Sequence, residues 1–171
     1  MSILPPPPNL SQALKDPRAI REKIVQQSMR NAIHSWLQET GFPHNLSKQI
    51  LLSPTAKDFH NIFEHLISLI DQDFVFNKST PKTFEDDIIP LLRAHSYPFV
   101  DSIDKKYLAA PASMHSWPPL VAALHWLTEL GKVLLKIFCS LCWLTSTLGK
   151  NGILQQQRTY ITACGARTRS I

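Results

Sequence analysis

The amino-acid sequence predicts an all-α fold. Apolar residues recur at helical spacing in several segments, proline and glycine stand where these segments should begin or end, and no segment sustains the alternation of a β-strand. The chain has 171 residues, the length of about one domain, which is enough to bury a core without disulfides or metal ions.

The first helix is predicted to start at Asp16-Pro17-Arg18, with Asp16 as its N-cap and Pro17 in its first turn. Gly41 is expected to end it. The predicted buried face recurs every four residues and consists of Val25, Met29, Ile33 and Leu37, with Trp36 beside them.

A second start signal, Ser53-Pro54, precedes an apolar stripe too wide for a helix that faces solvent. This helix is therefore expected to be the central one of the core. Its apolar positions are Phe59, Ile62, Phe63, Leu66, Ile67, Leu69 and Ile70.

Two further helices are predicted. Thr83 and Asp86 resemble a capping box before an apolar run that should end near His95, and Pro90 should kink or delay that helix. The last helix is expected to begin near Pro118 and to end at Gly131. Its apolar positions are Leu120, Val121, Leu124, Leu127 and Leu130.

Composition divides the chain into a proline-rich flexible leader (1–14), a helical domain (15–132) and an atypical tail (133–171). The tail holds all three cysteines and supplies the whole net charge of +5, since the basic and acidic residues before it balance. It could continue the last helix, anchor the chain in a membrane, or be a terminus unrelated to the domain. We favour the third interpretation.

The sequence does not favour an enzyme. Gly41 and Gly131 are the only glycines before the tail, so no phosphate-binding loop of the nucleotide-binding kind can be drawn. Cys139 and Cys142 form a lone pair, whereas a structural zinc ion needs four ligands. We therefore expect no catalysis, no cofactor and no metal ion.

Basic residues are the remaining candidates for function. They lie on or beside the predicted helices, and together they could form a patch that meets an acidic polymer through weak, salt-sensitive contacts. Lys105 and Lys106 are expected on a loop before Trp117. The candidates are Lys23, Lys48, Lys57, Lys82, Arg93 and Lys105.

Several short motifs carry a family resemblance over residues 15–132. In order, they are Asp16-Pro17-Arg18, Gly41-Phe42-Pro43-His44-Asn45, Ser53 to Phe59, Phe84-Glu85-Asp86, Tyr97-Pro98-Phe99 and His115-Ser116-Trp117-Pro118. This pattern resembles the N-terminal calponin-homology domain of the outer-kinetochore Ndc80 family, also called highly expressed in cancer. Leu124-His125-Trp126-Leu127 and Met114 to Trp117 resemble the fungal members more than the animal ones.

The resemblance implies a calponin-homology-like domain that binds microtubules at the kinetochore, on chromosomes in the nucleus, beside a Nuf2-type partner subunit. It implies no direct contact with nucleic acid or membrane. Lys23, Lys57 and Arg93 match basic positions of the family, whereas Lys48, Lys82 and Lys105 fall near such positions. Family members also carry a long basic leader and a long coiled coil, which this chain does not display. An actin-binding or scaffolding calponin-homology domain is the alternative, because one fold serves several partners.

Overall fold

The chain folds as helices packed around one long helix. The computed structural model describes residues 16–47, 49–71, 74 and 84–148, and the side chains of these residues up to 140. Within these ranges there is no strand, which confirms the predicted all-α class. The elements are α1 (Lys23–Glu39), α2 (Ala56–Ile70), α3 (Phe84–Ala94), the 3-10 helix η1 (Val100–Ser102), α4 (Lys105–Ala109) and α5 (Trp117–Leu148).

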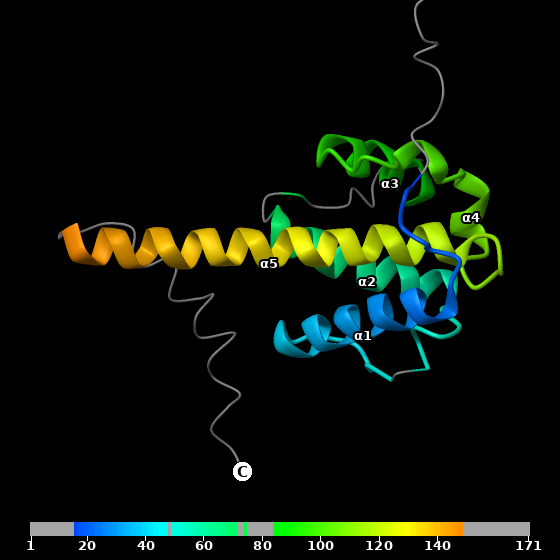
Figure 1. Ribbon diagram of the computed structural model, residues 1–171, viewed down its shortest axis with the longest axis horizontal. Coiled ribbons are helices and arrows are strands. Elements are labelled where there is room, and N and C mark those ends of the chain that lie inside the picture. The colour runs from blue at the N-terminus through cyan, green and yellow to red at the C-terminus, as the bar shows by residue number, and fades with distance from the viewer. Residues whose placement is uncertain (1–15, 48, 72–73, 75–83, 149–171) are drawn as a thin grey trace, which may run out of the picture.

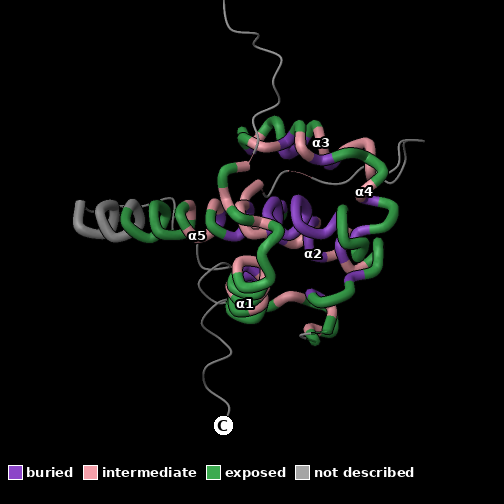
Figure 2. The backbone as a smooth tube through the Cα atoms, turned by 45° about the vertical axis from the view of Figure 1, so that its right-hand side comes forward, coloured by how far each residue is buried: buried purple, intermediate pink, exposed green. Residues whose placement is uncertain are grey.

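Helix α5 is the centre of the core. Both α1 and α2 pack against it, and its first turns are buried throughout (Figures 1 and 2). Leu120, Leu124 and Leu127 of α5 have no exposed surface. The expectation that the second helix is the central one was therefore wrong, although α2 contributes the large buried rings of Phe59 and Phe63.

The predicted end of the last helix at Gly131 was also wrong, because α5 continues to Leu148. Gly131 is buried against the indole of Trp36, so it serves a close approach of α1 and α5 rather than a helix end. Continuation of the helix, one of the three interpretations of the tail, therefore holds as far as Leu148. Among the helices that the structure describes, none has the length and apolar character needed to cross a membrane.

Helix α1 begins at Lys23 with Glu22 as its N-cap, six residues later than predicted. The Asp16 carboxylate accepts hydrogen bonds from the backbone N–H and the guanidinium of Arg18, at 2.9 Å in each case, and therefore closes a local turn instead of capping a helix. Glu22 takes the N-cap position and its side chain makes no capping hydrogen bond.

Helix α2 begins just after the predicted signal, and its cap is Thr55. The Asp58 N–H donates to Thr55 Oγ1 at 3.1 Å, and the Thr55 N–H donates to Asp58 Oδ2 at 3.0 Å. This reciprocal pair is a capping box, which satisfies two backbone donors that the helix leaves open.

Helix α3 runs through Pro90 and ends at Ala94, so proline did not delay its start. Thr83, the other half of the predicted capping box, lies outside the described residues. Beyond α3 the structure adds η1 and α4, which the sequence analysis did not predict, and Lys105 therefore lies in the first turn of a short helix rather than on a loop.

The three large core helices begin at one end of the domain. Trp36, late in α1, contacts Gly131, which is well along α5, and Thr40, directly after α1, lies 2.9 Å from His65 in the second half of α2. Figure 1 shows that α1, α2 and α5 run in the same direction, and these contacts agree with that arrangement. We name this end, which holds the first turns of α1, α2 and α5, the helix-start end.

Candidate interaction surface

Lys23 and Lys57 lie in the first turns of α1 and α2, at the helix-start end. Both side chains belong to exposed residues, and within the described part of the chain neither ammonium group has an ion-pair partner. The amino end of a helix carries a partial positive charge, which acidic residues usually offset. In α1 the acidic residue at this end is the N-cap Glu22, and the first turn that follows contains Lys23 and no acidic residue.

Arg93 and Lys105 lie in a different setting, because each is paired with a carboxylate. Arg93, in the last turn of α3, donates to Asp101 Oδ1 of η1 at 2.9 Å, and Lys105 of α4 pairs with Asp86 of α3. The four side chains are between 37 and 65% exposed. Pairs as exposed as these stabilise a fold by at most about 1 kcal/mol, so each cation can exchange its partner.

The six predicted basic residues therefore do not form one uniform set. The structure brings Lys23 and Lys57 to the helix-start end without carboxylate partners, and it gives Arg93 and Lys105 acidic neighbours that their sequence positions did not reveal. Lys48 and Lys82 lie outside the described residues. The patch that they could form together stays a prediction, and the four that can be placed differ in whether a carboxylate pairs with them.

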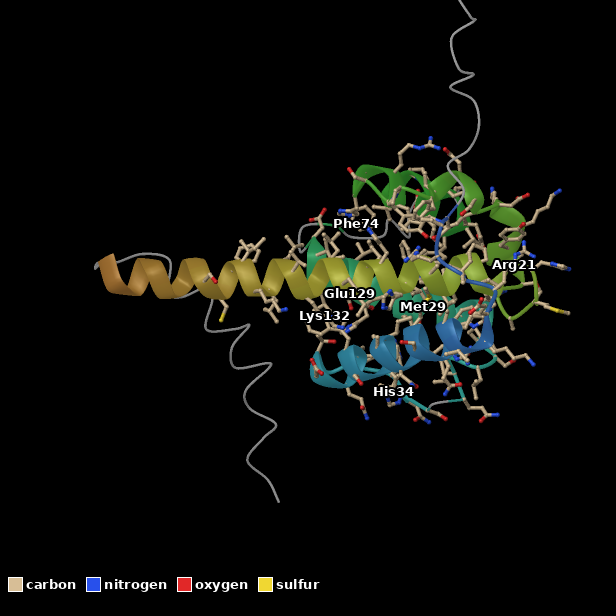
Figure 3. All side chains as sticks on the ribbon, viewed as in Figure 1. Arg21, Met29, His34, Phe74, Glu129 and Lys132 are labelled. Carbon is tan, nitrogen blue, oxygen red and sulfur yellow. The ribbon has the colours of Figure 1, made fainter. Side chains whose placement is uncertain are left out.

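Arg21 is a cation that the sequence analysis missed. Its side chain is exposed and projects outward at the helix-start end, whereas Glu129 and Lys132 lie farther along α5 (Figure 3). Within the described residues Arg21 has no ion-pair partner. The signal that could have found it is its position two residues before Lys23, in a segment whose only nearby acid is Glu22.

The segment that carries Arg21 and Lys23 is anchored by Arg18. The Arg18 guanidinium binds Asp16 at 2.6 Å, lies 3.4 Å from the Tyr97 hydroxyl, and stands 5.3 Å from the centre of the Phe99 ring. Tyr97 in turn packs edge-on against Trp126 of α5. The chain that leads into α1 is thus fixed to the core, and the first turn of α1 has a defined position.

The contacts of Arg18 and burial shift the pKa values of Asp16 and Tyr97. Burial of Asp16 favours its neutral form, but the hydrogen bonds and the charge of Arg18 outweigh it and hold the pKa of Asp16 below its usual value. Burial raises the pKa of Tyr97 to about 12. At neutral pH the Asp16 carboxylate is therefore ionised and the Tyr97 hydroxyl keeps its proton.

The described residues hold no cluster of metal-binding side chains. Among them, no three side chains of the metal-binding types His, Cys, Asp and Glu gather at one place. A small recess is lined by Phe42, His44, Asn45, Ile50, Asp58 and Asn61. The exposed cations are features of this part of the chain that could recognise an acidic partner.

Comparison with protein families decides what kind of domain this is. Residues 24–145 match the sequence profile described as the HEC/Ndc80p family. The chain belongs to this family. The match confirms the resemblance found in the sequence, and it continues past residue 132 into the later part of α5.

Curated HEC/Ndc80p relatives come from fungi and animals. The chain is 38% identical over 125 residues to the probable kinetochore protein NDC80 of Cryptococcus neoformans, a match that covers 72% of this chain and 17% of the relative. It is 33% identical over 129 residues to the kinetochore protein ndc80 of Schizosaccharomyces pombe, covering 75 and 20%. The NDC80 homolog of Gallus gallus is 31% identical over 123 residues, covering 72 and 18%. The chain thus spans about a fifth of the length of these relatives.

Proposed function

We propose that this domain is the microtubule-binding head of a kinetochore subunit, and that it helps attach chromosomes to spindle microtubules in the nucleus. The proposal rests on membership in a family whose curated relatives are kinetochore proteins and on the exposed cations of the helix-start end. Its mechanism is electrostatic docking onto the acidic surface of tubulin, without catalysis or a cofactor.

One observation carries this mechanism. Lys23 and Arg21 flank the N-cap residue Glu22 of α1, both are exposed, and neither has an ion-pair partner within the described residues. Cations of this kind lose little when an acidic partner arrives, because they give up no existing pair. Lys57 in the first turn of α2 also has no ion-pair partner within the described residues, although Asp58 lies next to it in the same turn.

Arg93 and Lys105 are expected to contribute less to tubulin binding than Lys23 and Lys57. Each must release Asp101 or Asp86, or share it, before it contacts tubulin. We therefore expect their removal to weaken binding less than removal of Lys23 or Lys57. Lys48 and Lys82 remain candidates from the sequence alone.

Co-sedimentation of the full chain with microtubules and with actin filaments tests the proposal. We expect the chain to pellet with microtubules, and the triple variant Arg21→Ala, Lys23→Ala, Lys57→Ala to lose most of this binding while its helix content stays unchanged. Lys136→Ala, an exposed cation far from the helix-start end, is the matched control and should pellet like the wild type. Pelleting with actin alone would instead favour an actin-binding calponin-homology domain.

We further propose that α5 pairs with a Nuf2-type partner subunit of the same complex. Beyond Lys132 the helix leaves the body of the domain (Figure 1), and Val133, Leu135, Ile137 and Phe138 are each between 42 and 60% exposed. A helix with apolar side chains this exposed is typical of one that packs against another helix. Co-expression with the partner should protect these positions from hydrogen exchange, and the substitution Phe138→Asp should remove that protection.

A further inference from the structure

The two most exposed large apolar side chains of the described residues lie near the cations of the helix-start end. Ile24, in the first turn of α1, is 82% exposed, and Met114, in the loop before α5, is 84% exposed. A single exposed apolar residue is common on a protein surface. Two such residues at one end of the domain form a surface that the electrostatic mechanism does not use.

The register of α1 and α5 sets both residues at one level. Trp36 lies 13 residues after Lys23, and Gly131, which it contacts, lies 14 residues after Trp117. Because both helices rise about 1.5 Å per residue in the same direction, their first turns lie at nearly the same height along the bundle. Ile24 and the loop that carries Met114 therefore share the outer end of the domain.

Two cations lie beside Ile24 in the chain. Arg21 and Lys23 precede it within three residues, with Glu22 between them, and all four residues are exposed. Within the described residues, neither cation has an ion-pair partner that would hold it to the domain itself. This end of the domain thus combines two exposed cations with two apolar side chains that stand clear of the core.

We propose that Ile24 and Met114 insert into an apolar recess on the acidic protein surface that Arg21 and Lys23 contact. This inference rests on the proposed function and makes the tubulin surface the partner. The apolar contacts add affinity that salt does not screen, whereas the cations provide the part that salt weakens. Docking therefore depends on a matched recess as well as on charge, which gives it specificity over other acidic surfaces.

An anionic lipid surface is a less fitting partner for the same side chains. A helix that lies in a membrane interface presents a continuous apolar face along its length. In α1 that face is used inside the domain, where Met29, Ile33 and Leu37 are buried. Only the first turn of α1 and one loop residue remain for the partner, and a small recess in a protein fits these better than a bilayer.

The test is microtubule co-sedimentation of the full chain across a series of salt concentrations. The double variant Ile24→Gln, Met114→Gln should bind about tenfold more weakly than wild type at every salt concentration, with an unchanged salt dependence, because it removes apolar surface and no charge. The variant Arg21→Gln, Lys23→Gln should instead lower the salt dependence. The matched control is Leu52→Gln, whose side chain is 52% exposed and belongs to neither proposed interface, and it should bind like wild type.

Rescue and a lipid control make the outcome decisive. Ile24→Leu, Met114→Leu restores apolar surface and should restore binding. If wild type pellets with microtubules and the variant Ile24→Gln, Met114→Gln pellets equally well, the apolar contact is refuted while the proposed function stands. If wild type fails to pellet with microtubules, the apolar contact and the proposed function are both refuted. Binding to phosphatidylserine vesicles that requires Ile24 and Met114, without binding to microtubules, would assign the surface to lipid and overturn the proposal.

Discussion

Gly131 of α5 lies directly against the indole of Trp36 of α1. A Cβ atom on Gly131 would stand 3.6 Å from both Cζ2 and Nε1 of that ring, which is ordinary van der Waals contact. Lys132, the next residue, places its ammonium group 6.0 Å from the centre of the same ring. The two helices therefore meet at Trp36, and this contact fixes the register that aligns their first turns.

Replacing Gly131 with alanine should stabilise the domain. Alanine removes the cost of glycine inside a helix, about 1 kcal/mol, and its methyl group fits beside Trp36 without displacement. We expect the free energy of unfolding to rise by about 0.5–1 kcal/mol in chemical denaturation. Gly131→Leu is the contrasting variant, because its larger side chain must move the indole. A destabilised alanine variant would contradict this prediction, because it would mean that the methyl group does not fit beside Trp36 without moving the helices apart.

The same contact explains what the sequence could not predict about α5. In isolation, a glycine after a run of periodic apolar residues is a typical helix end, and only the position of Trp36 in space shows that this glycine serves packing instead. The start of α1 was misplaced for a similar reason. Asp16 suits a helix cap, but Arg18 occupies its carboxylate and connects it to Tyr97, a residue distant in the chain.

The spacing of apolar residues in the sequence correctly predicted which face of α1 is buried. The four-residue spacing in α1 identified Met29, Ile33 and Leu37, all of which are buried, because a helical face depends on neighbouring residues alone. The exposure of Lys23 followed from the same periodicity. The partners of Arg93 and Lys105 did not, because α3 must pack beside η1 and α4 before Asp101 and Asp86 come within reach.

The capping box of α2 should contribute measurably to stability. Thr55→Ala removes the side-chain oxygen that accepts the Asp58 N–H, so one backbone donor at the helix start loses its partner. We expect a loss of about 1 kcal/mol in the free energy of unfolding, measured by chemical denaturation. Thr55→Ser keeps the oxygen and should retain most of the stability. Equal losses in both variants would mean that the methyl group matters and the cap does not.

His65 should make the domain less stable in mild acid. Burial is the main cause that lowers the pKa of His65, with the nearby His44 adding to it. The Thr40 hydroxyl donates to the Trp36 carbonyl oxygen at 2.8 Å, so it accepts from His65, which therefore carries its proton on Nε2. The unfolded chain binds the second proton more readily than the folded one, so stability is present above pH 6.5 and is lost as pH falls through the lowered pKa.

Thermal unfolding across the range from pH 7.5 to about pH 5 measures this effect. We expect the melting temperature of wild type to fall over that range, and the fall to be smaller in His65→Gln, whose amide can still donate to Thr40. His125, whose pKa burial also lowers despite the attraction of Glu129, should contribute a second part of the slope. The interpretation fails if His65→Gln shows the same pH dependence as wild type.

Breaking the ion pair between Arg93 and Asp101 should strengthen microtubule binding, because the Arg93 guanidinium then becomes available to tubulin. Asp101→Asn removes the carboxylate that accepts the 2.9 Å hydrogen bond from Arg93 while keeping the size of the side chain. Both residues are more than half exposed, so the fold should lose at most about 1 kcal/mol. We expect co-sedimentation to show a two- to fivefold gain in affinity at low salt, which corresponds to a few tenths to about 1 kcal/mol.

In an Arg93→Ala background, the same substitution should give a clearly smaller gain, because only the repulsion between Asp101 and tubulin is then relieved. An undiminished gain in that background would place Arg93 outside the contact and leave Lys23, Lys57 and Arg21 as the cations that dock.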